Sequence, residues 1–156
     1  MEDIQLTEHF RLSEFTRSAT AQRYGIRNIP TRQHIENLRY LCEQVLEPLR
    51  RHADCPIVIS SGYRSSKLNA QVGGVRNSQH QTGEAADISI PKIPVGPSGE
   101  PHTDLVLGRE WMEWILQNCL YDQCIWETAN GQDFWIHVSC HRNLYNRGTY
   151  IEYLRK

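Results

Sequence analysis

The sequence predicts an α+β fold, with helices packed on a small antiparallel sheet. One basis is residues 32–51, where apolar side chains recur at the 3.6-residue period of an amphipathic helix. The other is a pair of strand-like segments, 121–127 and 134–140, joined by a loop with an Asn-Gly pair, which is typical of hairpins. At 156 residues the chain can enclose its own core, so we predict one domain over 1–156.

The first 29 residues are expected to form short helical turns and loops. Ser13 and Ser18 are of the type that caps helix starts, and Gly25 suits the end of the second turn. Four apolar side chains should anchor this segment on the main body: Phe10, Leu12, Phe15 and Ile26.

The helix over 32–51 is expected to bury one stripe and to expose the opposite face. The buried stripe comprises Ile35, Leu38, Leu41, Cys42, Val45, Leu46 and Leu49. The solvated face comprises Arg32, Glu36, Glu43, Glu47 and Arg50. Pro48 lies near the end and should kink or loosen the last turn, because proline has no amide donor.

Residues 57–60 are a β-branched run that predicts a buried strand, and the turn after it projects Arg64. Residues 65–72 are predicted as a short helix, capped by a serine and ended by two glycines. A second strand is expected over 85–90.

Residues 91–101 hold four prolines and two glycines, which predicts a loop. Thr103 is the expected cap of a helix over 104–119. Its inward side chains should be Leu105, Met112, Ile115, Leu116 and Cys119. Residues 149–154 suit an edge strand near the end of the chain.

Composition excludes some classes of function. A net charge of −1 argues against nucleic-acid binding as the main role, and no apolar run approaches the roughly 20 residues of a membrane helix. The first residues lack a signal-peptide pattern, so the default expectation is a cytoplasmic location. The five cysteines include no Cys-x-x-Cys and have no nearby basic partner, which favours reduced, buried thiols over a cysteine nucleophile.

Three residues stand out as candidate metal ligands. His80 and Asp87 have six residues between them, on a loop that enters a predicted strand, and His137 lies in a second strand far downstream. Two imidazoles and one carboxylate are a suitable ligand set for a catalytic zinc, with the fourth position open to water. We therefore hypothesise that His80, Asp87 and His137 hold one zinc ion.

Two motifs carry a resemblance to a known family. They are Ser78-x-His80-x-x-Gly83-x-Ala85-x-Asp87 and Trp135-Ile136-His137-Val138-Ser139. Together they resemble the zinc D-Ala-D-Ala carboxypeptidase and L,D-endopeptidase family, peptidase family M15, and most closely its small bacterial and phage members. Other similar stretches extend the likeness over about residues 10–143: Leu12–Phe15, Val45–Arg50, Ser60–Ser65, Gly73-Gly74 and Asp122–Glu127.

The resemblance implies a zinc peptidase that cuts peptidoglycan stem peptides, with the fold shared by the Hedgehog signalling domain. Many relatives carry their catalytic base three positions before the second histidine, where this chain has Phe134. The remaining candidates are Glu127 and Asp133, of which Glu127 matches the acidic residue of the subgroup's Asp-Gln-x-Ile-x-Glu motif and is preferred. Arg64 would face the developing oxyanion or a substrate carboxylate, and Ser78 would bind the substrate backbone or terminus.

Two other functions compete with this one. The Hedgehog domain resembles these peptidases in its zinc ligands yet acts by binding, so an inactive zinc-containing module for wall peptides or a protein partner is the main alternative. A cysteine hydrolase is the third. The choice between carboxypeptidase and endopeptidase and the oligomeric state stay open. A phage lysin released through a membrane pore would reconcile a substrate outside the membrane with the missing export signal, as would a shortened sequence or recycling of wall fragments inside the cell.

Overall fold

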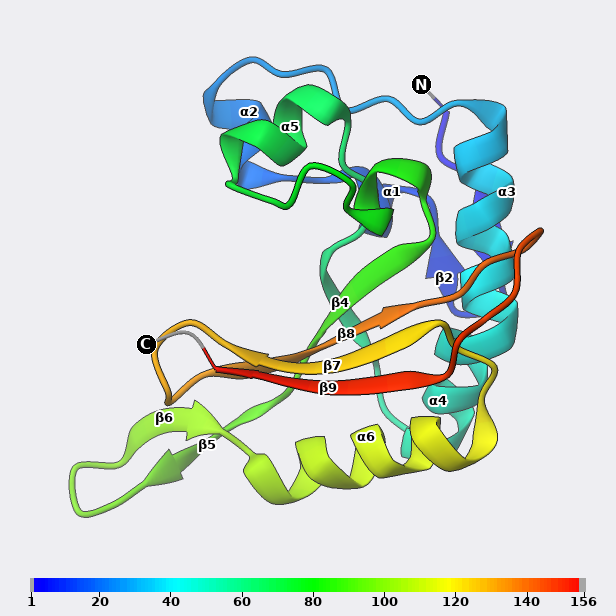
Figure 1. Ribbon diagram of the computed structural model, residues 1–156. Helices are drawn as coiled ribbons and strands as arrows, with labels where there is room; N and C mark the ends of the chain where they lie inside the picture. The colour runs from blue at the N-terminus through cyan, green and yellow to red at the C-terminus, as the bar shows by residue number, and fades with distance from the viewer. Residues whose placement is uncertain (1, 155–156) are drawn as a thin grey trace.

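The computed structural model describes residues 2–154 and confirms the α+β class (Figure 1). A five-stranded sheet with the order β3-β4-β8-β7-β9 forms its centre. The strands are β3 (Val58–Ser61), β4 (Ala85–Ser89), β7 (Gln123–Thr128), β8 (Phe134–Ser139) and β9 (Thr149–Leu154). Neighbouring strands are antiparallel except β7 and β9, which are parallel. The predicted hairpin and the predicted edge strand are both confirmed.

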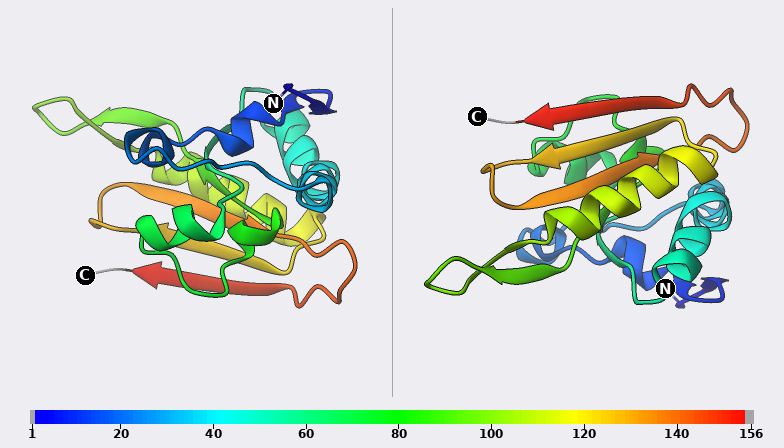
Figure 2. Two further views of the ribbon diagram at one scale, coloured as in Figure 1. Left: turned by 90° about the horizontal axis from the view of Figure 1, so that it is seen from above. Right: turned by 90° about the horizontal axis from the view of Figure 1, so that it is seen from below.

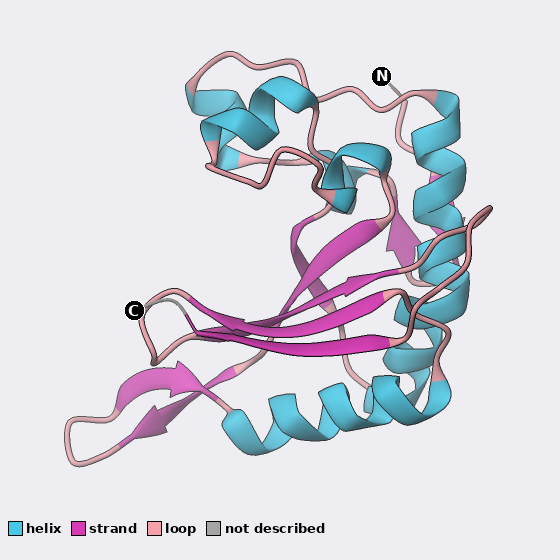
Figure 3. Cartoon of the chain, viewed as in Figure 1, coloured by secondary structure: helices cyan, strands magenta, loops and turns pink. Residues whose placement is uncertain are grey.

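The sheet separates two layers of helices, as Figure 3 shows. Helix α6 (Leu105–Asn118) covers one face, while α2 (Ala19–Arg23), α5 (Ser66–Gln71) and the 3-10 turn η2 (Gln79–Thr82) lie over the other (Figure 2). Side chains on the α6 side of the hairpin are buried with those of the helix: Cys124, Trp126, Ile136 and Val138 against Trp111, Met112 and Ile115. Because side chains alternate along a strand, the residues between them face the other layer.

The long helical segment consists of three parts in sequence: α3 (Arg32–Leu41), the π-helical turn η1 (Cys42–Leu46) and α4 (Glu47–Ala53). In the π turn the amide of Glu47 donates to the carbonyl of Cys42, five residues back. Pro48 follows directly. Proline has no amide hydrogen to donate and its ring needs space, and the wider π turn accommodates both. The predicted stripe is confirmed, with Ile35 only half-buried and the other six side chains fully buried.

The expectation of a solvated face was wrong at Glu47, which is only 3% exposed. Its carboxylate accepts hydrogen bonds from the Thr7 hydroxyl (2.9 Å) and the His9 amide (2.6 Å), and lies 2.9 Å from Nδ1 of His9. These partners flank the turn between β1 (Gln5–Thr7) and β2 (Phe10–Arg11), so Glu47 fastens the N-terminal segment to the helix.

Near the N-terminus the anchors Phe10, Leu12, Phe15 and Ile26 are all buried, as predicted. Ser18 caps α2 by accepting from the amide of Ala21, and Gly25 follows with φ +61°. Ser13 does not cap a helix. It is the first residue of α1 (Ser13–Thr16), and its hydroxyl donates to Asp3.

The predicted strand at 57–60 is observed as the edge strand β3, and only one of its faces is buried: Ile57 and Ile59 pack in the core, while Val58 is 51% exposed. The short helix α5 is capped by Ser65 as predicted and ends before Gly73.

The prediction of a loop over 91–101 is wrong. Strands β5 (Lys92–Val95) and β6 (Glu100–Thr103) form a hairpin that projects from the body (Figure 1). The cap of α6 is Asp104, whose carboxylate accepts from the amide of Leu107. The Thr103 hydroxyl instead accepts from the amide of Phe134 (2.8 Å), and Leu105 is 48% exposed rather than inward.

All five cysteines are free thiols, and burial raises the pKa of Cys119 to about 11 and of Cys140 to about 12. These two thiols stay protonated near neutral pH, which disfavours either of them as the nucleophile of a cysteine hydrolase. Among the described helices, none combines the length and the apolar character needed to cross a membrane.

The role of Glu47 predicts a large loss of stability on substitution. Glu47→Ala should lower the free energy of unfolding by about 1–3 kcal/mol, because it removes the buried acceptor of the part-buried hydrogen bonds from Thr7 and His9. Glu43→Ala, an exposed position on the same helical segment, is the control and should change it by less than about 0.5 kcal/mol. Equal midpoints for both variants in urea denaturation would contradict this assignment.

Candidate metal site

A cleft of about 990 Å³ lies between the sheet and the layer formed by α2, α5 and η2. Its floor consists of residues from β4, β7, β8 and β9, all on the face that α6 leaves free. Its opposite wall includes Arg64, the segment 72–75 and Ser78. The three predicted metal ligands all line this cleft. The hairpin β5–β6 does not contribute to its lining.

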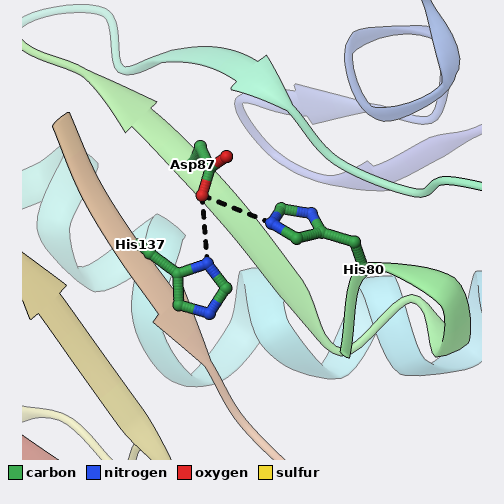
Figure 4. Close-up of side chains that lie close together, drawn as sticks. All are labelled: His80, Asp87 and His137. Carbon is green, nitrogen blue, oxygen red and sulfur yellow. Dashed lines mark hydrogen bonds and ion pairs between the residues drawn. The ribbon is translucent and has the colours of Figure 1, made fainter. Parts of the chain in front are cut away.

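The structure brings His80, Asp87 and His137 together (Figure 4). Asp87 on β4 is directly opposite His137 on β8 in the antiparallel register, and Oδ1 of Asp87 lies 3.0 Å from Nδ1 of His137. His80 reaches the same oxygen from η2, with its Nε2 at 3.3 Å. Three different elements therefore supply one ligand atom each, and these atoms lie within 4.8 Å of one another.

These separations fit a zinc ion. Ligands about 2.0–2.2 Å from a tetrahedral zinc lie about 3.3–3.6 Å apart, close to the spacing of Asp87 from each histidine. Both imidazoles are buried, with His80 1% and His137 8% exposed. The donor set of two imidazoles and one carboxylate, which leaves a position open, is that of a catalytic zinc site.

The carbonyl of Gly62 orients the ring of His80. It lies 2.7 Å from Nδ1 of His80, and because a carbonyl only accepts, Nδ1 carries the proton. Nε2, which faces Asp87 at 3.3 Å, is then the nitrogen that would bind a metal. Sequence reasoning missed this contact, since Gly62 lies 18 residues before His80 and no side chain signals it.

The cluster is also electrostatically coupled. Burial opposes ionisation of Asp87, but His80 and His137 outweigh it and hold the pKa of the carboxyl well below its usual range. Asp87 is therefore ionised at neutral pH, as a carboxylate that binds a metal must be.

Arg64 lies where the sequence placed it, at the cleft. Burial lowers the pKa of its guanidinium, while the negative charges of Asp87 and Glu127 act in the opposite direction. Nε of Arg64 has no hydrogen-bond partner among residues 2–154, although it is buried. A guanidinium so placed can receive an acceptor oxygen from a ligand in the cleft.

One backbone hydrogen bond and one side chain fix the turn that carries Arg64. The Arg64 amide donates to the carbonyl of His80 (3.0 Å), which couples the turn to η2. Asn28 donates to the carbonyl of Tyr63 (2.9 Å) and accepts from the amide of Ser65 (2.8 Å). Asn28 had no role in the sequence analysis, because its partners lie more than 30 residues downstream.

Of the two candidate bases, only Glu127 lines the cleft. It lies on β7 opposite Trp135, two residues before His137 on the neighbouring strand. Asp133 lies in the hairpin loop, where it forms an ion pair with Lys92 at 3.3 Å and accepts from Asn130. The geometry therefore favours Glu127.

Phe134 occupies the position at which many relatives carry the catalytic base. In this chain that side chain faces away from the cleft. Its ring stacks on Trp126 at 5.2 Å, on the α6 side of the sheet.

Ser78 lines the cleft, and its hydroxyl accepts from the amide of His80 at 3.2 Å. Ser78 therefore caps η2 and has this structural role beside any contact with substrate.

Comparison with known proteins agrees with this geometry. The sequence profile of Peptidase M15 matches residues 8–96, which is more than half of the chain. The chain therefore belongs to the Peptidase M15 family, as its motifs predicted. The matched range includes His80 and Asp87 and ends before His137.

A particular relative is the zinc D-Ala-D-Ala carboxypeptidase of Streptomyces albus G. The two sequences are 50% identical over 40 residues, which cover 24% of this chain and 16% of that protein. The chain thus matches only a short part of its curated relative.

The contact between Gly62 and α1 predicts a strict requirement for glycine. A Cβ at position 62 would lie 2.6 Å from Cα of Phe15, so Gly62→Ala should lower the free energy of unfolding by about 2–3 kcal/mol. Gly73→Ala is the control. Its Cβ meets nothing within 4 Å, and its positive φ alone should cost about 1 kcal/mol. A cost at Gly62 no larger than at Gly73 in urea denaturation would refute the contact.

Proposed function

We propose that this chain is a zinc metallopeptidase with one metal ion held by His80, Asp87 and His137. The observation that carries the proposal is the convergence of these three side chains on the floor of a cleft that also holds a carboxylate and a guanidinium. Membership of the Peptidase M15 family supports it. A zinc ion at this position would supply Lewis acidity, which polarises a scissile carbonyl and acidifies water.

The protein groups around the ligands have complementary tasks. Glu127 is the general base, which accepts a proton from the attacking water and delivers it to the leaving amine. Arg64 stabilises the negative charge that develops on the carbonyl oxygen, or binds a substrate carboxylate. Ser78 contacts the substrate backbone or terminus while its hydroxyl caps η2.

We further propose that the substrate is a peptidoglycan stem peptide that contains D-amino acids. The zinc D-Ala-D-Ala carboxypeptidase to which the chain is similar supports this substrate class. The volume of about 990 Å³ is at the upper end of the range for ligand sites and gives room for a peptide of several residues. Either removal of a terminal residue or cleavage within the peptide is compatible with this reaction.

The role of Glu127 predicts a loss of turnover on substitution. Glu127→Gln should lower the rate of stem-peptide hydrolysis by at least about 100-fold, because the amide cannot accept the proton. Asp133→Asn is the matched control and should hydrolyse at the unaltered rate, since Asp133 is outside the cleft lining. Mass spectrometry of purified muropeptides incubated with the zinc-loaded protein measures both rates.

Two treatments complete this experiment. A zinc chelator should abolish turnover, and a thiol alkylator should leave it intact. Zinc retention without turnover of any stem peptide would instead support a binding module. Turnover that resists the chelator and fails after alkylation would support a cysteine hydrolase.

A further inference from the structure

A second cluster of charged and polar side chains borders the cleft. We refer to it as the clasp, and it comprises Gln79, Glu84, Asp122, His141 and Arg147. Three of its members, Gln79, His141 and Arg147, also line the cleft. None was assigned a role from the sequence.

Asp122 is the centre of the clasp and is fully buried. Its carboxylate accepts from the backbone amide of Arg147 (2.9 Å), from Nε (2.9 Å) and from Nη2 of the same residue (2.7 Å). The hydrogen bonds from Arg147 hold the pKa of Asp122 well below its usual range, against the effect of burial. Its backbone joins neighbouring strands, since its amide donates to Ser139 and its carbonyl accepts from Thr149.

The clasp connects these strand ends to η2. The side-chain amide of Gln79, the residue before His80, donates to Oδ2 of Asp122 at 2.9 Å. His141 lies between two carboxylates, with Nδ1 2.6 Å from Glu84 and Nε2 3.2 Å from Asp122. These side-chain contacts, together with the hydrogen bond from the amide of Cys140 to the carbonyl of Glu84 (3.0 Å), hold the segment 79–84 against the floor of the cleft.

The position of His80 depends on both sides of η2. On the opposite side of the cleft, the carbonyl of Gly62 and the amide of Arg64 hold its ring and its backbone. On the floor side, the contacts from Gln79 and Glu84 to Asp122 and His141 fix the distance between η2 and the strands that carry the other two ligands. Because η2 has only four residues, its internal hydrogen bonds cannot set that distance alone.

We propose that the clasp is a positioning device for the metal site, with Asp122 and Gln79 as positioning residues that hold His80 at the correct distance from Asp87 and His137. The inference rests on the proposed metal site. Outer contacts that orient a metal ligand typically contribute about 10- to 100-fold in metal affinity. Loss of the clasp should therefore weaken zinc binding in a protein that is still folded.

The test measures the zinc dissociation constant of the full chain by competition with a chromophoric chelator. Gln79→Met keeps the length of the side chain and the ion pair between Asp122 and Arg147, but removes the hydrogen bond to the floor. It should weaken zinc binding by about 2- to 12-fold, the range that one hydrogen bond spans. Asp122→Asn, which removes the charge at the centre, should weaken it by about 10-fold or more.

Asp3→Asn is the matched control. Asp3 also accepts from an arginine, Nε of Arg11 at 2.8 Å, and from a backbone amide, that of Ser13 at 2.9 Å, but it lies outside the cleft lining. The control should lose stability in urea without any change in zinc affinity. The visible spectrum of the cobalt(II)-loaded protein should change for the clasp variants and stay constant for Asp3→Asn.

The outcomes separate the two proposals. Failure of the unaltered chain to bind zinc would refute the metal site itself. Zinc binding by the unaltered chain, with equal affinity and an equal cobalt spectrum in Gln79→Met, would refute the clasp while the metal site stands. If Asp122→Asn does not fold, Gln79→Met alone decides the question.

Discussion

The pairing of Asp87 with His137 across β4 and β8 is the constraint on which the site depends. The two residues are opposite each other in the antiparallel register, so the sheet itself sets their separation. A slip of one residue would turn one of them toward α6 and place an apolar neighbour in the cleft, because side chains alternate between faces. The buried side chains of Ile136 and Val138 under α6 prevent that slip. The core of the protein thus fixes the geometry of its candidate metal site.

His80 and Arg64 complete the site from the other side of the cleft, opposite the sheet. His80 lies in the turn η2, which is held by the carbonyl of Gly62 on one side of the cleft and by the clasp on the other. Arg64 lies in the turn after β3, and its amide donates a hydrogen bond to the carbonyl of His80 in η2. The two groups that complete the site are therefore coupled to each other as well as to the floor. This arrangement is typical of a preorganised site, in which little movement is needed on binding.

Sequence reasoning was strongest where a local pattern determines the structure. The spacing of His80 and Asp87 and the strand around His137 predicted three residues that the structure brings together. The 3.6-residue period predicted the buried stripe of the long helix, because burial follows the helical face. Prediction from sequence failed at Glu47, because its burial depends on partners 38 and 40 residues earlier in the chain. It also failed at 91–101, because the prolines of this projecting hairpin are typical of a loop. The clasp was missed for the same reason, since Asp122 and Gln79 are 43 residues apart.

The central claim is that His80, Asp87 and His137 bind one metal ion together. The most direct measurement is anomalous diffraction at the zinc edge from crystals of the zinc-loaded protein. The account predicts a single strong peak about 2.0–2.2 Å from Nε2 of His80, an oxygen of Asp87 and Nδ1 of His137, with a position open toward the cleft. A peak elsewhere, or zinc-loaded crystals without a peak between these three side chains, would contradict it.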